Sequence, residues 1–336
     1  VKEIMGDKLP ADAQELVLNA GDSEGGNRCS MSHLAVALST SVNAVSILNA
    51  EVAETMFSEK NIIPITNGVH HPTWTSDTMT QLFDEHLPDW KANPTRLKDA
   101  QSIPLEALRQ ARNDNRKLLR ELVKEETGVE LEEHRLTIGF ARRFATYKRA
   151  NLVFHDLEKL REIGAGKIQF VFSGKAHPKD QGGKQLIRDI FASAKTVEEE
   201  IPVAFLENYN MDTGLAMTSG VDIWLNNPIR PLEASGTSGM KAAMNGVPNC
   251  SILDGWWPEA CKHGINGWAI GNAEDDRNDP RDAANIYSTL QNDVLPSWEG
   301  KDETWANLMR ESIASSAGFT GRRMIEDYLH FYRKFN

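Results

Sequence analysis

The feature that most constrains the fold is a regular alternation of two kinds of segment between residues 136 and 270. Short apolar runs alternate there with longer stretches whose apolar residues recur at helical spacing. This alternation predicts an α/β fold, a Rossmann-like parallel sheet with helices on both faces. We expect strands at residues 136–141, 167–173, 203–207, 222–226, 249–253 and 267–270, and helices at 150–163, 181–199, 212–219 and 239–245.

The segments that flank this region are mainly helical in pattern. Apolar residues recur at mostly helical spacings over residues 31–57, and residues 105–124 are amphipathic, so we expect a helix in each. Residues 62–65 predict a short strand that ends at the turn signal Asn67-Gly68. Residues 305–332 predict one or two helices with a break around residues 318–321.

Charge and cysteine content exclude several classes of protein. The net charge of -11 argues against a nucleic-acid surface over the whole molecule. The sequence has no run of 18 or more apolar residues, so we expect no segment that spans a membrane. Cys29, Cys250 and Cys261 lack the spacing of metal ligands, so we expect no metal site. Their odd, sparse number favours a reducing compartment, and we expect a cytoplasmic protein. The chain begins with Val1, which suggests a piece of a longer protein.

The residues that follow each strand are the first candidates for a site, because parallel sheets bind ligands outside the carboxyl ends of their strands. The strand at 136–141 is followed by Arg142, Arg143, Lys148 and Arg149. Such a cluster is compatible with a solvated charge run. It is also compatible with an anion site, in which arginines donate in pairs to phosphate oxygens.

The other strands are followed by weaker candidates. His177 lies in a Gly-containing loop and suits either a ligand contact or a plain surface position. Tyr209 suits either the same crevice or the edge of the core. The tryptophans at 256, 257 and 268 lie near Asp254 and suit either sugar stacking or the core, which we expect for at least one of them.

The most informative segment follows the fourth strand. The small-residue sequence SGTSG at 235–239 leads into a short helix that Gly246 ends, with Lys241 in its first turn. Such loops let backbone N–H groups approach an anion, and the start of a helix adds partial positive charge. A lysine beside a phosphate site suits a pyridoxal-phosphate enzyme. A flexible connection with an exposed lysine remains the alternative. The nucleotide fingerprints G-x-x-x-x-G-K-[ST] and G-x-G-x-x-G are absent here.

Several motifs together resemble one family. EASGTSGMK at 233–241 resembles the pyridoxal-phosphate lysine motif of the glycogen, starch and maltodextrin phosphorylases, above all their bacterial and archaeal branch. Four further motifs occur in that family's order: RRFATYKR at 142–149, GKAHPKD at 174–180, FLENY at 205–209 and LDGWW at 253–257. The resemblance implies a GT-B type glycosyltransferase fold with its site between two domains. It divides this chain into a helical remnant of the amino-terminal domain at 1–95 and a cofactor-binding Rossmann-like domain with C-terminal helices at 96–336.

The resemblance also implies an activity, the phosphorolysis of α-1,4-glucan by inorganic phosphate to glucose 1-phosphate, with a possible homodimer in the full-length protein. It implies roles for particular residues. Lys241 would carry pyridoxal 5'-phosphate as a Schiff base, and Lys241, Arg143 and Lys148 would be the catalytic residues. The cofactor would also contact Thr237, Ser238, Gly239, Tyr209, Arg142 and Lys148. The glucose and the substrate phosphate would contact Glu233, Ala234, Ser235, Gly236 and Arg143.

Two departures from the family's pattern lie upstream. Thr40-Ser41-Val42-Asn43-Ala44 stands where the family usually has a His or Arg before V-N-G, and Leu48-Asn49-Ala50-Glu51 replaces L-H-G-E. Since the family is also about twice this long, we expect this chain to be inactive alone. Two alternatives remain open: a nucleotide-sugar glycosyltransferase of the same fold, similar to glycogen synthase, and a non-catalytic remnant that binds cofactor or glucan.

Overall fold

The computed structural model describes residues 10, 12–15, 17, 30–58, 60–300 and 302–334. Cys29 lies outside the described residues, whereas Cys250 and Cys261 are free thiols. Within the described part of the chain, no helix is long and apolar enough to cross a membrane.

A six-stranded parallel sheet forms the centre of the molecule, in the order β5-β4-β3-β6-β7-β8. Each strand begins and ends within one residue of its predicted bounds, so the predicted α/β fold is confirmed. Every neighbouring pair is parallel. The strands are β3 (Leu136–Ala141), β4 (Ile168–Ser173), β5 (Val203–Leu206), β6 (Ile223–Asn226), β7 (Asn249–Ile252) and β8 (Gly267–Ile270).

The strand order creates a switch point between β3 and β6. From β3 the chain first winds outward through β4 and β5, and then returns to the other side of β3 to form β6. In such sheets a crevice opens outside the carboxyl ends of the two central strands. Arg142 directly follows β3, and residues 227–236 directly follow β6, so both segments lie at this crevice.

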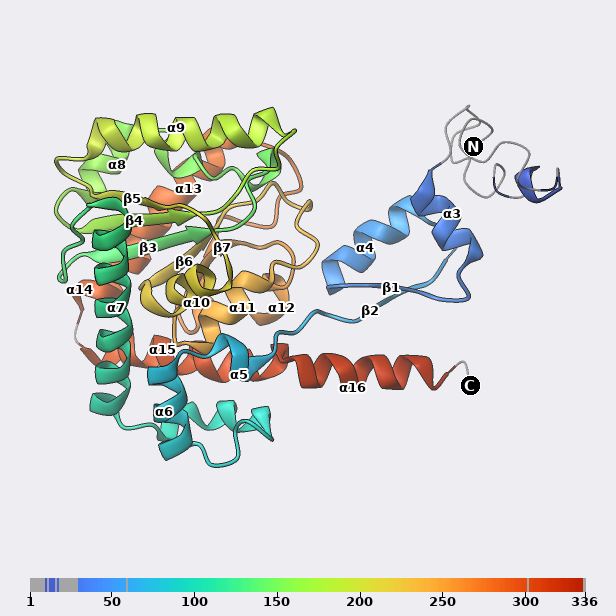
Figure 1. The fold of residues 1–336 in the computed structure, drawn as a ribbon, viewed down its shortest axis with the longest axis horizontal. Coiled ribbons are helices and arrows are strands. Elements are labelled where there is room, and N and C mark those ends of the chain that lie inside the picture. The colour runs from blue at the N-terminus through green and yellow to red at the C-terminus, as the bar shows by residue number, and fades with distance from the viewer. Residues whose placement is uncertain are drawn as a thin grey trace.

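Helices cover both faces of the sheet (Figure 1). The residues of β3 divide between two cores: Ile138 and Phe140 belong to one buried cluster and Ala141 to the other. Because successive side chains point to opposite faces, a strand between two helical layers is apolar throughout. One face is covered by α8 (Leu157–Gly164), α9 (Gln181–Val197) and α13 (Asp279–Thr289), and the other by α7 (Leu105–Thr127), α10 (Met211–Gly220) and α11 (Thr237–Met244).

The remaining helices and turns are short, apart from two near the C-terminus. The predicted break near residue 318 is confirmed, and the predicted helix at 105–124 corresponds to α7. The helices are α5 (His71–Trp74), α6 (Asp77–His86), α12 (Trp257–Ala260), α14 (Leu295–Glu299), α15 (Asp302–Ser316) and α16 (Gly321–Tyr332). The 3₁₀ helices are η2 (Pro94–Ser102), η3 (Thr146–Lys148), η4 (Leu152–Phe154) and η6 (Ala317–Phe319), and η5 (Leu290–Val294) is a π-helix.

The prediction of one helix over residues 31–57 is wrong. The structure has two helices there, α3 (Met31–Leu38) and α4 (Ile47–Met56), separated by β1 (Val42–Ala44), which pairs in parallel with β2 (Ile62–Pro64). Ser46 begins α4, because its side chain accepts a hydrogen bond from the amide of Asn49. A valine-rich run at helical spacing suits a short strand equally well, so periodicity alone could not separate the two.

The two alanines that replace family glycines fit their positions. Ala44 ends β1 and Ala50 lies in α4, and both are buried. Neither has a positive φ, so the backbone strain that a glycine would relieve does not arise.

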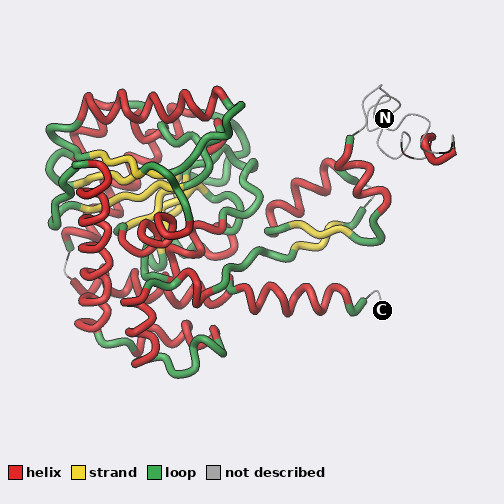
Figure 2. The backbone as a smooth tube through the Cα atoms, viewed as in Figure 1, coloured by secondary structure: helices red, strands yellow, loops and turns green. Residues whose placement is uncertain are grey.

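Helix α16 and the lobe formed by α3, β1, α4 and β2 extend together from the body (Figures 1 and 2). Asn43 donates from Nδ2 to the hydroxyl of Tyr328 at 3.0 Å, and Arg323 donates from Nη2 to the carbonyl oxygens of Thr66 and Asn67. Large apolar side chains remain exposed on both parts, namely Met31, Leu38, Ile47, Met56, Ile325, Leu329 and Tyr332.

Candidate functional site

Three of the four cations that follow β3 are buried. Arg142 and Lys148 are each 7% exposed and Arg149 is 2% exposed, whereas Arg143 is exposed. The turn η3 directs Lys148 inward. The cluster is therefore not a solvated charge run.

Glu233 joins two of these cations. Its Oε2 accepts a hydrogen bond from Arg142 Nη2 at 2.6 Å and one from Lys148 Nζ at 3.3 Å. Arg142 and Lys148 come from the segment after β3, and Glu233 comes from the loop after β6. The switch point of the sheet thus brings together three residues that are far apart in the sequence.

This cluster keeps unused capacity for an anion. Arg142 Nε and Nη1 are buried, and no partner for them lies among the described residues. Buried donors normally have acceptors, so such atoms mark a place where a ligand can bind. Burial, assisted by the nearby Arg142, lowers the pKa of Lys148 to about 8. An anion bound here would favour the charged form of this lysine.

The start of α11 lies in the loop after β6 and offers further donors. Gly236 precedes the helix with a φ of 84°, and no side chain caps the first amides. The first N–H groups of a helix have no acceptor within the helix, so those of Thr237 and Ser238 are available to a ligand. The hydroxyl of Ser238 accepts a hydrogen bond from Trp224 Nε1 at 3.2 Å, which fixes its side chain.

Lys241 lies in the second turn of α11, not the first, because the helix begins two residues earlier than the sequence predicts. Its Nζ lies 3.3 Å from the centre of the Trp74 ring. Among the described residues no carboxylate pairs with this ammonium, and burial lowers its pKa to about 8. The lysine is therefore held against an aromatic face, and the alternative of an exposed lysine on a flexible connection is wrong.

Trp74 is a candidate site residue that the sequence analysis missed. It ends the short helix α5, far upstream of Lys241, and no local motif marks it. Tyr209 lies close to it: a Cβ atom at Gly214 would come within 3.3 Å of the Tyr209 hydroxyl and 3.6 Å of the Trp74 ring. Tyr209 also packs against a buried cluster, so the core-edge position that we considered for it holds alongside its proximity to Trp74.

Asp254 supports the loop that carries Glu233, and the sequence analysis did not include it among the site residues. Its Oδ2 accepts a hydrogen bond from the amide of Glu233 at 3.0 Å, and its Oδ1 accepts one from the amide of Gly255 at 2.8 Å. Burial raises the pKa of Asp254 to about 6. Gly255 has a φ of 60°, and a Cβ atom there would lie 2.3 Å from the carbonyl oxygen of Ser235, so the two loops touch.

Among the described residues, none of the remaining candidates joins the ion pairs of Glu233. His177 is exposed in its loop. Trp256, Trp257 and Trp268 are all buried, which confirms the core alternative for them. Ser235 is buried, and its hydroxyl has no partner among the described residues.

A cavity of about 550 Å³ lies at the other end of the central strands, where His134 precedes β3 and Asp222 precedes β6, and it is separate from this site. The buried Arg112 and the partly buried Arg116 are among the residues that line it. Arg112 donates to the carbonyl oxygens of Ser219 and Val221, and Arg116 pairs with Asp222 at 2.9 Å. Because the main chain and a carboxylate already satisfy these cations, the cavity lacks the open donors that the Arg142 cluster has.

Comparison with known proteins agrees with this arrangement. The family described as carbohydrate phosphorylase matches residues 4–261. The chain is similar to a maltodextrin phosphorylase of Thermococcus litoralis, with 39% identity over 97% of this chain and 43% of that protein. It is similar to a glycogen phosphorylase of Aquifex aeolicus, with 41% identity over 95% of this chain and 51% of that protein. It is also 34% identical to a glycogen phosphorylase of Mycobacterium tuberculosis, over 96% of this chain and 42% of that protein.

The chain spans about half the length of these curated relatives. The similarity extends over nearly all of it, and the match to the family includes every segment that forms the cluster around Glu233 and Lys241. This chain belongs to the carbohydrate phosphorylase family.

Proposed function

We propose that this chain forms the cofactor-binding part of an α-1,4-glucan phosphorylase, which cleaves glucan with inorganic phosphate and releases glucose 1-phosphate. The observation that carries the proposal is the cluster of Arg142, Lys148 and Glu233 beside the start of the helix that bears Lys241. Relatives that are named maltodextrin and glycogen phosphorylases support it.

Pyridoxal 5'-phosphate fits the residues that are present. A lysine that attacks a carbonyl must lose its proton, and the lowered pKa of Lys241 favours that form near neutral pH. The open amides of Thr237 and Ser238 and the unpartnered nitrogens of Arg142 would hold a phosphate group, with Gly239 close by. When bound, the cofactor would supply a phosphate group able to exchange a proton with the substrate phosphate.

Two aromatic side chains would enclose the ring of such a group. Trp74 covers the amine of Lys241, and Tyr209 lies next to Trp74. Burial raises the pKa of Tyr209, so its hydroxyl stays protonated and can donate a hydrogen bond. Both residues would orient the ring and exclude water from the amine.

The cations would stabilise charge that develops between sugar and phosphate. Arg143, exposed at the mouth of the cluster, and Lys148, held within it, would bind the substrate phosphate. Fixed donors aimed at developing charge are usually the largest single contribution to catalysis. Glu233 and the backbone of residues 234–236 would hold glucose hydroxyls, with Asp254 fixing the amide of Glu233.

The wider assignments are part of the same proposal. The substrates would be α-1,4-glucan and inorganic phosphate, the full-length protein would form a homodimer, and the location would be cytoplasmic. Residues 1–95 would belong to the amino-terminal domain, and residues 96–336 would form the cofactor-binding domain. Met79 and Leu97 share a buried cluster with the sheet, so packing continues across this boundary.

A second candidate function rests on the length of the chain. Because this chain spans about half of its relatives, it would be inactive alone and bind cofactor or glucan without turnover. An assay of glucose 1-phosphate release from maltodextrin and phosphate distinguishes the two candidates. Release by the purified chain supports phosphorolysis, and its absence in a chain that binds the cofactor supports the non-catalytic alternative.

The first experiment tests the lysine. The purified chain is incubated with pyridoxal phosphate, reduced with borohydride and digested, and the modified lysine is mapped by mass spectrometry. We expect a single stable label on Lys241, its loss in Lys241→Ala, and no change in Lys195→Ala, which alters an exposed lysine on α9. Unchanged labelling in Lys241→Ala contradicts the assignment.

A further inference from the structure

Arg149 is the most deeply buried of the four cations after β3, yet it does not join Glu233. We propose that Arg149 is a positioning residue, whose guanidinium fastens the turn that carries Lys148 to the loop that carries Glu233. The inference deepens the proposed function, because it concerns the geometry of the same anion site.

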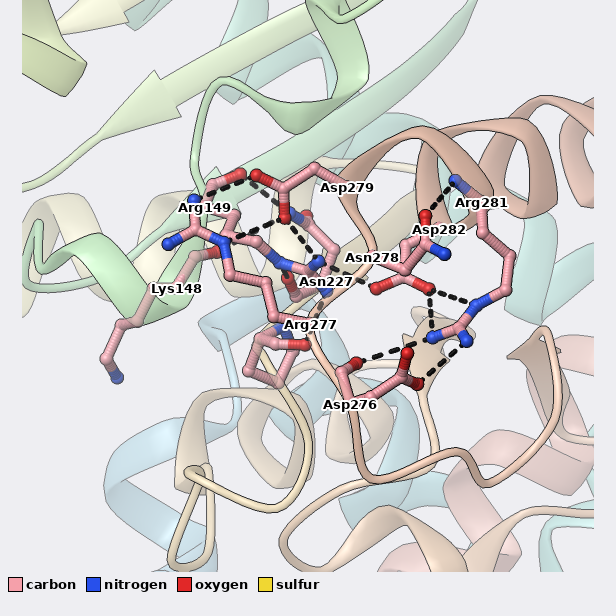
Figure 3. A network of polar contacts seen from close by, with 10 residues as sticks. Lys148, Arg149, Asn227, Asp276, Arg277, Asn278, Asp279, Arg281 and Asp282 are labelled. Carbon is pink, nitrogen blue, oxygen red and sulfur yellow. Dashed lines mark hydrogen bonds and ion pairs between the residues drawn. The ribbon is translucent and has the colours of Figure 1, made fainter.

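The backbone conformation of Arg149 directs its side chain away from the side chain of Lys148. Arg149 has a φ of 49°, a left-handed conformation that is uncommon for residues other than glycine. The two neighbouring side chains therefore leave the turn in different directions, as Figure 3 shows: Lys148 extends away from the network that surrounds Arg149. Surrounding contacts must hold this disfavoured conformation in place.

The first set of contacts joins the turn to the segment after β6. Arg149 donates from Nε to the carbonyl oxygen of Asn227 at 3.0 Å and from Nη2 to that of Pro228 at 2.8 Å. In return Asn227 Nδ2 donates to the carbonyl oxygen of Arg149 at 2.7 Å, and the amide of Ile229 donates to that of Tyr147 at 2.8 Å. The two walls of the crevice are thus fastened together four residues before Glu233.

The second set of contacts neutralises the buried charge. Arg149 Nη1 lies 3.0 Å from Asp279 Oδ1 and 2.7 Å from Asp282 Oδ2, both at the start of α13. Two outer arginines hold these carboxylates in turn: Arg277 pairs with Asp279 at 2.9 Å and Arg281 with Asp282 at 3.1 Å (Figure 3).

These contacts determine what kind of role Arg149 has. Carboxylates and carbonyl oxygens occupy its guanidinium, so it is not arranged to bind an anion itself. Its charge is balanced locally, so it adds little attraction for phosphate at Glu233. What remains is placement: Lys148 has a long flexible side chain, and small displacements of a charged group weaken the binding it provides.

The test compares variants of the full 336-residue chain in two measurements. The first follows the titration of Lys148 by NMR after isotopic methylation of the lysines, with its resonance assigned by its loss in Lys148→Met. In Arg149→Met we expect the turn to relax and Lys148 to reach water, so that its pKa rises from about 8 toward about 10.4. The second measures the affinity for inorganic phosphate by calorimetry, which we expect to weaken about tenfold.

Matched variants separate placement from general loss of stability. Arg112→Met removes another buried arginine that donates to main-chain carbonyls, but at the other end of the central strands. It should lower the melting temperature and leave both the Lys148 titration and the phosphate affinity unchanged. Arg149→Lys keeps the charge and should recover only part of the effect. Asp282→Asn gives the same test if Arg149→Met does not fold.

A double variant gives the decisive outcome. If Arg149 acts through Lys148, Arg149→Met causes no further loss of phosphate affinity in a Lys148→Met background. An unchanged Lys148 titration in both Arg149→Met and Asp282→Asn overturns the inference, as does full additivity of the two losses. A wild-type chain with a lowered Lys148 pKa but no affinity for phosphate counts against the proposed function instead, and the titration alone then decides the role of Arg149.

Discussion

Lys241 and Lys148 are both partly removed from water, and burial is the first cause of their lowered pKa values of about 8. For Lys241 this predicts a characteristic pH profile. Attachment of pyridoxal phosphate should speed up as pH rises toward 8 and level off above it, whereas exposed lysines should continue to gain up to about pH 10. Samples trapped with borohydride after a fixed time, at each pH, give the two profiles by peptide mapping. A Lys241 profile that follows the exposed lysines would show that its burial has no chemical effect.

Lys148 should reveal its burial as a pH-dependent change in stability. Its folded pKa lies below its unfolded value, so the unfolded chain binds more protons between about pH 8 and 10.5. Burial of the charged lysine lowers the free energy of unfolding by about 3 kcal/mol for a shift of this size. This destabilisation is fully present below pH 8 and is lost as pH rises through that window. Urea unfolding of the wild type and Lys148→Met at several pH values checks this. The difference in the free energy of unfolding between the two proteins should change only within this pH window, because all other groups titrate in both proteins.

Arg143 differs from its neighbours in being exposed, which suits a residue that meets a ligand from solution. We expect Arg143→Ala to weaken the binding of inorganic phosphate while the binding of maltodextrin changes little, because its charge complements the anion alone. Calorimetric titrations with each ligand give the two changes. Equal losses for both ligands would contradict this role.

At the scale of elements, the sequence predicted the sheet well because its four inner strands are buried on both faces and therefore read as short apolar runs. The edge strands β5 and β8 keep partly exposed residues but are still mostly apolar. The helix proposed for residues 31–57 was wrong because β1 is only Val42–Ala44, and the valines at 42 and 45 also fit a helical period. The start of α11 was placed two residues late, because Gly236 begins it without a capping side chain, so no signal marks the boundary.

The site was predictable only where its parts follow strands. Arg142, Lys148, Glu233 and Lys241 belong to local motifs next to predicted strand ends. Asp254 also follows a strand, but its role depends on its contact with the amide of Glu233, and Trp74 and the pairing of Arg149 with Asp282 depend likewise on contacts between distant segments. Periodicity and spacing carry no information about such contacts, so the structure was needed to find them.

Helix α11 packs so closely on the sheet that Gly239 has no room for a side chain. A Cβ atom there would lie 2.3 Å from Asn249 Oδ1 and 3.1 Å from the Trp256 ring. Gly239→Ala should therefore shift the helix and destabilise the fold by about 1–3 kcal/mol, despite the higher helix propensity of alanine. It should also slow the labelling of Lys241.

Thermal unfolding and peptide mapping test this expectation. Gly318→Ala is the matched control, since nothing lies within 4 Å of a Cβ atom at that position. Its effect should be small in both measurements. Equal stability of the two variants would mean that α11 tolerates displacement.

At the scale of the whole molecule, apolar side chains remain exposed on α16 and on the lobe beside it. Ile325, Leu329 and Tyr332 form a stripe at helical spacing, and each is at least 50% exposed. Exposed apolar patches of this kind promote association. We expect the isolated chain to associate as its concentration rises, and the double variant Ile325→Lys and Leu329→Lys to remain monomeric.

Sedimentation velocity over a range of concentrations measures this association. The matched control places lysines at the exposed polar residues Glu326 and His330 of the same helix, with the same spacing, and should associate like the wild type. Identical behaviour of the two double variants would show that the stripe is not the contact surface.

Glu233 sits between Arg142 and Lys148 within a chain of net charge -11, so the cationic cluster already holds its own counter-ion. A phosphate that binds the open nitrogens of Arg142 would share these cations with the carboxylate and weaken its hold on them. We therefore expect phosphate affinity to depend only weakly on ionic strength. Phosphate binding would then free Glu233 for a sugar hydroxyl, which would couple the two halves of the proposed substrate pair through a single side chain.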